Sequence, residues 1–180
     1  MKLPELKIGT KIARVPIMQG GMAIRLSTGA LAAAVANQGG IGLIAASGMT
    51  PQELRYEIRM ARSLSKGVIG INIMFAAKKF AEMVNTAIDE GIDLVVAGAG
   101  FLRDIFALGK ASGTPVVPIV SSVKLAKISQ RLGAAAIVKP TGLCITTTSL
   151  SRRLFLILWQ LWIFLLLPPV VFCMARILLI

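Results

Sequence analysis

The sequence predicts an α/β fold in which parallel strands alternate with helices. Short, unbroken apolar runs rich in Val and Ile recur along residues 1–138, as they do in strands covered on both faces. Amphipathic patterns fill the gaps, and glycines follow several of them, where the end of a helix needs a left-handed residue. Short connections between such elements give parallel strands joined by right-handed crossovers. Five strand–helix units and a sixth strand fit either a doubly wound sheet or the first part of an eight-stranded barrel.

Each element has its own local signal. The second helix has the clearest start, because Thr50 can cap it, Pro51 fits its first turn and Glu53 completes a capping box. The expected strands are residues 15–19, 41–46, 68–74, 94–97, 116–120 and 135–138. The expected helices are residues 27–37, 51–64, 77–90, 102–111 and 123–132.

Composition excludes several classes of function. The net charge is +12, but the basic residues are scattered over polar helix faces, which favours a solvated surface or an anionic ligand over nucleic acid. The only two cysteines, Cys144 and Cys173, give no disulfide framework and no metal-ligand spacing, so no metal site is expected. Met1–Thr10 has no apolar signal-peptide core, which indicates a cytoplasmic protein. Because the chain has no histidine, a Ser-His or Cys-His nucleophile and a histidine base are excluded.

Polar and glycine residues gather after the strands, at the end where parallel α/β folds bind ligands. The first such loop is Gln19-Gly20-Gly21-Met22, and the third strand ends in Gly70-Ile71-Asn72-Ile73-Met74. Gly98-Ala99-Gly100 and Ser121-Ser122 follow the next two strands. Paired glycines also serve as plain turns, and an Asn at a strand end also bonds its own loop. The glycine spacing matches neither a dinucleotide fingerprint nor a P-loop.

Taken together, these segments resemble a known family. Pro16-Ile17-Met18-Gln19-Gly20-Gly21-Met22 and residues 31–42, LAAAVANQGGIG, are similar to the opening of the nitronate monooxygenase (2-nitropropane dioxygenase-like) flavoproteins. The FMN-dependent enoyl-(acyl carrier protein) reductases share the pattern. Residues 70–74, 98–100, 118–123 and 133–138 agree with it in order and spacing. The resemblance covers residues 1–138.

This resemblance implies a partial (β/α)8 TIM barrel, comprising the first five to six βα units. It implies FMN as cofactor, with the residues of the first loop, Gln19, Gly20, Gly21 and Met22, against the flavin and Asn72 reaching it. It implies a small-molecule substrate, with oxidation of alkyl nitronates by O2 as the reaction. Reduction of an enoyl thioester by NAD(P)H is the alternative enzymatic reading.

The sequence departs from the family after Val138. The family continues there with an acidic residue and Ala-Gly-Gly-His, whereas this chain has Lys139-Pro140-Thr141-Gly142. No catalytic residue is therefore assigned. FMN phosphate is usually held after strands seven and eight, for which the chain offers no pattern, so the FMN site is expected to be incomplete. We expect a truncated and inactive enzyme, with its first and sixth strands left as unpaired edges.

The tail, residues 139–180, contains no Asp or Glu and forms the second region of the chain after residues 1–138. Its apolar stretch Leu154–Ala175 is long enough to span a bilayer, with Arg152 and Arg153 beside it. This leaves a membrane-associated, non-catalytic fragment as an alternative. Gln160 and Pro168-Pro169 interrupt the stretch. The abrupt change in composition between residues 1–138 and the tail favours a frameshift product near Val138 over a membrane segment.

Overall fold

The computed structural model describes residues 4–22, 25–77, 79–98, 100–140 and 175–179. Strand–helix alternation begins with α1 (Gly29–Asn37), β3 (Ile41–Ala45), α2 (Pro51–Leu64) and β4 (Val68–Met74). It continues with α3 (Phe80–Asp89), β5 (Leu94–Gly98), α4 (Asp104–Ser112), β6 (Val116–Pro118), α5 (Val123–Arg131) and β7 (Ala136–Pro140). These bounds lie within three residues of those that the sequence predicts.

The strands pair in the order of a barrel. The parallel sheet runs β3-β4-β5-β6, with no reversal of the kind that defines a doubly wound sheet. Two parallel bridges extend it, from Met18 to Ile41 at one edge and from Ile119 to Val138 at the other. Six consecutive strand positions therefore curve as in a (β/α)8 barrel, and the doubly wound alternative is excluded. The predicted first strand, residues 15–19, is reduced to the bridge at Met18.

The two faces of the sheet bury different sets of residues. The outward set, which includes Ile44, Ile69, Ile71, Ile73 and Val95, packs against the helices. The inward set forms a second core, which comprises Ile41, Leu43, Leu94, Val96, Val117, Ala136 and Val138. This segregation follows from strand alternation, and it makes the inward face the inside of an open barrel.

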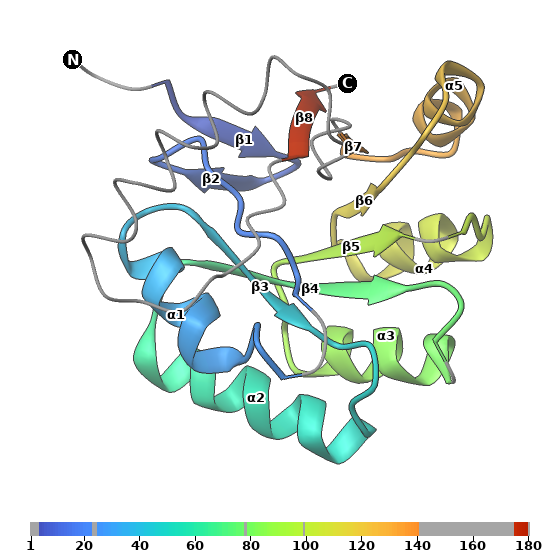
Figure 1. The fold of residues 1–180 in the computed structure, drawn as a ribbon. Helices are drawn as coiled ribbons and strands as arrows, with labels where there is room; N and C mark the ends of the chain where they lie inside the picture. The colour runs from blue at the N-terminus through green and yellow to red at the C-terminus, as the bar shows by residue number, and fades with distance from the viewer. Residues whose placement is uncertain (1–3, 23–24, 78, 99, 141–174, 180) are drawn as a thin grey trace, which may run out of the picture.

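An N-terminal hairpin, which the sequence analysis missed, covers the start of this inner face. Strand β1 (Leu6–Ile8) pairs antiparallel with β2 (Lys11–Ala13). Leu6 and Ile8 are buried in the inner core. The turn residue Gly9 has φ +58° and lies against Pro115, at the start of β6. Figure 1 shows the hairpin on one side of the sheet and helices α1, α2 and α3 on the other.

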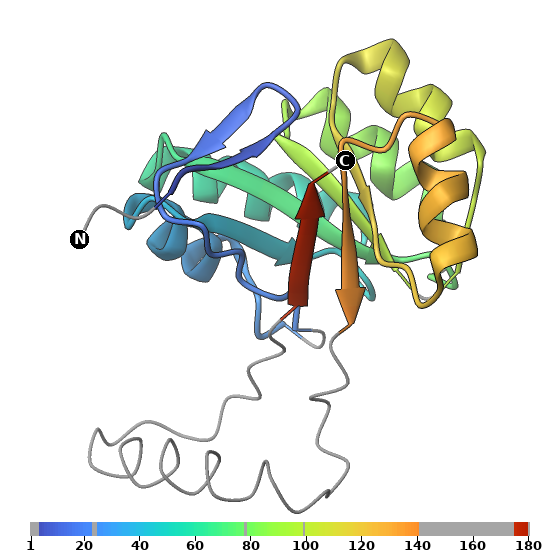
Figure 2. The ribbon, with the colours of Figure 1, turned by 90° about the horizontal axis from the view of Figure 1, so that it is seen from above.

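The edge at β7 is covered. Strand β8 (Ala175–Leu179) pairs antiparallel with β7, with Val138 opposite Ile177, and the two strands lie side by side in Figure 2. The expectation of an unpaired sixth strand was therefore wrong. Most of the apolar stretch Leu154–Ala175 lies outside the described residues. Within the described ranges, no helix is both long and apolar enough to cross a bilayer.

Candidate functional site

The carboxyl ends of the strands carry an amide that points into the barrel. In the register of the sheet, Asn72 of β4 lies beside Ala45 of β3 and Val96 of β5. Its neighbours Ile71 and Ile73 are buried on the helix side, so strand alternation turns Asn72 inward. Asn72 is partly exposed. Its side chain makes no hydrogen bond to another described residue, and no buried side-chain nitrogen or oxygen there lacks a partner. Its amide is therefore open to solvent.

Gly21 lies directly against Asn72. A Cβ atom at Gly21 would be 2.3 Å from the Asn72 Cβ and 2.7 Å from both its Cγ and Nδ2. No side chain fits there without a shift, so the first loop reaches Asn72 only because residue 21 is glycine. Among the described residues, the backbone N–H groups of Gly20 and Gly21 make no backbone hydrogen bond. The Gly21 N–H therefore belongs to a residue in contact with Asn72, and the Gly20 N–H directly precedes it in the same loop.

Gln19 fixes the first loop to β3. Its Nε2 donates to the Leu43 carbonyl at 3.3 Å, and its Oε1 accepts from the Leu43 N–H at 3.2 Å. Nε2 also donates to the Gly20 carbonyl at 2.8 Å. Both ends of the Gln19 amide are occupied within the chain, so its clearest role is to hold the loop in place.

Ser27 is a site residue that the sequence analysis missed. It was predicted to begin the first helix, but the helix begins at Gly29 and Ser27 is fully buried beneath the loop. Its Oγ accepts from the Gln19 Nε2 at 2.7 Å and from the Met22 N–H at 2.9 Å. It also donates to the Gly20 carbonyl at 3.2 Å. No sequence signal separates this role from an ordinary helix cap, because both use a hydroxyl near the start of a helix.

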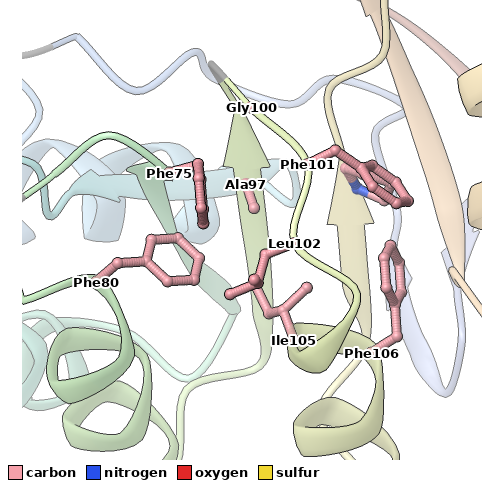
Figure 3. A pocket seen from close by; sticks show the side chains of 9 residues that line it. Phe75, Phe80, Ala97, Gly100, Phe101, Leu102, Ile105 and Phe106 are labelled. Atoms are coloured by element: carbon pink, nitrogen blue, oxygen red, sulfur yellow. The ribbon is translucent and has the colours of Figure 1, made fainter.

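Aromatic rings hold the loops that follow β4 and β5 (Figure 3). Phe75 and Phe80 meet edge to face with ring centroids 5.5 Å apart, and Phe101 and Phe106 are 5.7 Å apart. Gly100 has φ +148°, and a Cβ there would be 2.5 Å from the Phe75 ring. The space between the rings is about 10 Å³, room for about one water molecule. The cluster is therefore packing that supports the loop after Asn72.

The strand-end loops contain no Asp, Glu or His. The eight Asp and Glu residues of the chain lie near the N-terminus, on or at the ends of helices, or before β5. Glu53 is typical: the Thr50 N–H and Arg25 lower its pKa while it completes the predicted capping box of α2. In the described part of the chain, no group of three or more His, Cys, Asp or Glu residues could hold a metal. The site offers amide and backbone donors beside partly buried Met22.

Comparison with known proteins agrees with this arrangement. A family model described as nitronate monooxygenase matches residues 5–92, which include the first loop and Asn72. Residues 5–92 are thus similar to the nitronate monooxygenase family. The sequence-based recognition of the family and the partial-barrel fold are both confirmed.

Solved structures of other proteins resemble about two thirds of this chain. A solved structure of FabK from Thermotoga maritima is 37% identical with a TM-score of 0.64, covering 66% of this chain and 38% of that one. A nitroalkane oxidase from Streptomyces ansochromogenes, at 21% identity and a TM-score of 0.62, covers 68% of this chain and 45% of that one. That second likeness shows the fold alone.

One curated relative is a (3aS,4S,5R,7aS)-5-hydroxy-7a-methyl-1-oxo-octahydro-1H-indene-4-carboxyl-CoA dehydrogenase of Rhodococcus jostii (strain RHA1). It is 29% identical over 127 residues, which are 71% of this chain and 36% of the relative. This chain therefore spans little more than a third of the length of that relative. The family and its neighbours are oxidoreductases, and they are generally flavin enzymes.

The residues of the first loop and Asn72 fit the ring of an FMN group, which is one part of that cofactor. The flavin ring is flat and bears carbonyl oxygens and ring nitrogens, which accept N–H donors and need close backbone approach. Gly20, Gly21 and the open Asn72 amide meet that requirement. Contact of Gln19, Met22 or Asn72 with a flavin stays a prediction.

Proposed function

We propose that this chain carries the ring-facing part of the FMN site of an oxidoreductase of the nitronate monooxygenase type, acting on a small molecule. One observation carries the proposal: an open amide, Asn72, lies against Gly21 of the first loop, at the carboxyl ends of consecutive parallel strands. That end of a TIM barrel is where active sites form. The position lies within the family match, at residues 5–92.

Each residue has a specific part in this proposal. The N–H groups of Gly20 and Gly21 and the Asn72 amide bond the oxygens and nitrogens of the flavin ring. Met22 packs on the ring face through its polarizable sulfur. Gln19 and Ser27 hold the loop in place through the hydrogen bonds that join them to Gly20, Met22 and Leu43. When bound, FMN supplies the redox chemistry, accepting electrons from a nitronate and passing them to O2.

We further propose that this chain does not turn over nitronates by itself. The chain contains no histidine, and Lys139-Pro140-Thr141-Gly142 stands where the family has Ala-Gly-Gly-His. In this proposal the strand-end loops orient a ligand, and they contain no Asp, Glu or His to take a proton. Residues 139–180 are in this proposal a non-family segment. The nucleotide sequence after the Val138 codon tests that part: Ala-Gly-Gly-His in another reading frame supports a frameshift, and its absence argues against one.

A second candidate is reduction of an enoyl thioester by NAD(P)H. Two similarities favour it: 37% identity with FabK and 29% identity with a dehydrogenase named for a carboxyl-CoA compound. Anaerobic flavin bleaching by NADH and by a nitronate separates the two, measured with added FMN on a chain in which the family's remaining barrel replaces residues 139–180. Acceleration by NADH alone favours the reductase, and acceleration by the nitronate alone favours the oxidase.

The flavin site itself is tested by replacing the open amide. We expect Asn72→Ala to weaken riboflavin binding, measured by fluorescence quenching, by about tenfold, the equivalent of one good hydrogen bond. Asn85→Ala is the matched control, because Asn85 is an exposed amide within α3 and not in a strand-end loop. Equal binding by the two variants would remove the basis of the proposal.

A further inference from the structure

The structure contains a second hollow, at the end of the barrel opposite the candidate flavin site. Its volume is about 510 Å³. Its lining comes from β2 and from the segments that lead into β3, β4 and β5, and it includes Lys11, Arg14, Gly39, Lys66 and Asp93. Because these residues precede the strands, whereas Asn72 lies near a strand end, the two sites are at opposite ends of the sheet. We call this hollow the basal cavity.

The basal cavity is cationic. Lys11, Arg14 and Lys66 line it, and Asp93 is the single carboxylate among the lining residues. Arg14 and Lys66 are exposed residues, and within the described ranges neither forms an ion pair. Two unneutralised cations therefore face the same space, where each raises the local concentration of anions.

Asp93 does not cancel this charge. Its carboxylate is 2.8 Å from the Lys11 Nζ and 2.7 Å from an Arg62 nitrogen, and it accepts from the Ile69 N–H at 2.9 Å. Two cations and a backbone donor already satisfy it. Its charge is used to anchor the hairpin and α2 to the start of β4, so an entering anion meets the remaining cations.

The backbone beneath Arg14 leaves room for its guanidinium. Gly39 has φ +89°, and a Cβ there would be 3.3 Å from the Arg14 Nε and 3.5 Å from its Nη2. The guanidinium thus lies across a residue that has no side chain. Its planar fork of N–H donors suits bidentate contact with an oxyanion.

We propose that the basal cavity binds a compact oxyanion carrying at least two negative charges, such as a diphosphate or a polycarboxylate. The volume falls within the usual range of small-ligand sites. The lining has no aromatic ring on which a nucleobase could stack, so the charged group itself is the recognised part. Arg14 and Lys66 make the principal contacts, and Lys11 contributes its remaining N–H donors.

Binding of inorganic pyrophosphate to the full chain, measured by calorimetry at fixed ionic strength, tests this proposal. We expect the double variant Arg14→Gln with Lys66→Gln to weaken binding by at least about tenfold. The control removes an equal charge from α5, by Lys127→Gln with Arg131→Gln, and should change binding by less than about twofold. Equal losses in both variants would indicate general charge attraction and overturn the site, as would no binding by the unaltered chain.

A second measurement needs no variant, so it still tests the proposal if the substitutions prevent folding. Acetylation of lysines in the unaltered chain, followed by mass spectrometry, should slow at Lys66 when pyrophosphate is present and stay constant at Lys127. Citrate in place of pyrophosphate distinguishes a carboxylate ligand from a phosphate one. Equal protection of both lysines, or of neither, contradicts the proposal. Since Asn72 lies at the other end of the strands, failure here leaves the flavin proposal standing, and the reverse also holds.

Discussion

The contact between Gly21 and Asn72 gives a prediction that can be worked out from the structure. Gly21→Ala places a Cβ atom 2.3 Å from the Asn72 Cβ, whereas carbon atoms pack at about 3.5–4.0 Å. The deficit exceeds 1 Å, so the loop or β4 must shift. Overpacking of this kind costs about 1–3 kcal/mol. We expect a loss in the upper half of that range, about 2–3 kcal/mol, because Gln19 and Ser27 restrain the loop.

The destabilisation caused by Gly21→Ala should vanish when the Asn72 side chain is removed. All three of the closest atoms, Cβ, Cγ and Nδ2, belong to the Asn72 side chain, and Asn72→Gly deletes them. In that background Gly21→Ala should be neutral, or stabilising by about 0.4–1 kcal/mol through the unfolded state. The coupling free energy between the two substitutions should therefore exceed about 2 kcal/mol.

Urea unfolding followed by circular dichroism measures both quantities, provided that the slope with denaturant stays constant. Gly113→Ala serves as the control, because Gly113 has φ +71° with nothing within 4 Å. Gly113→Ala should destabilise the chain only through backbone strain at this positive φ. That loss of unfolding free energy should add to the loss caused by Asn72→Gly. A loss below about 0.5 kcal/mol for Gly21→Ala, or the same loss in both backgrounds, would refute the packing argument.

Three further predictions concern stability and activity. Asp93→Asn should lower the free energy of unfolding by about 2–3 kcal/mol near neutral pH, because its charged hydrogen bonds weaken. Burial alone would raise the pKa of Asp93, but the Ile69 N–H, Lys11 and Arg62 hold it below the ordinary value. The stabilisation is thus present above the unfolded pKa of about 3.9 and lost as pH falls through the lower folded pKa; unfolding curves of Asp93→Asn should lack this dependence. Thr50→Ala should cost about 1 kcal/mol in urea unfolding, and Thr50→Ser, which keeps the cap, much less. In an oxygen electrode, the chain with FMN should consume a nitronate no faster than free FMN, because loss of a general base removes a factor of roughly 10²–10⁴.

The helices and central strands could be predicted because their signals are local. The capping box of α2 needs only Thr50 and Glu53, and the structure contains both of its hydrogen bonds. Asn72 could be located because it lies in an apolar run long enough to define a strand. The order of the strands decides between the barrel and the doubly wound sheet, and it depends on contacts between distant segments. Periodicity left both open, and the family resemblance supplied the barrel.

The missed features depend on partners far along the chain. Strands β1 and β2 have three residues each, too few for a periodic signal, and burial against the inner core stabilises them. Asp93 accepts hydrogen bonds from Lys11 and Arg62, which are 82 and 31 positions away in the sequence. Spacing along the sequence cannot indicate such a contact. The role of Ser27 also depends on the folded loop, because its three hydrogen bonds require the loop to return over it.

The first loop and the end of β4 are the parts of the chain that we propose to face the flavin ring. Nuclear magnetic resonance of the ¹⁵N-labelled chain during titration with riboflavin tests that claim most directly. We predict that the signals of the Gly20 and Gly21 N–H groups and of the Asn72 side-chain amide shift with one common dissociation constant. The side-chain amide of Asn85 and the N–H of Gly133 should stay in place. Unchanged signals at Gly20, Gly21 and Asn72 at saturating riboflavin, or shifts confined to the basal cavity, would contradict it.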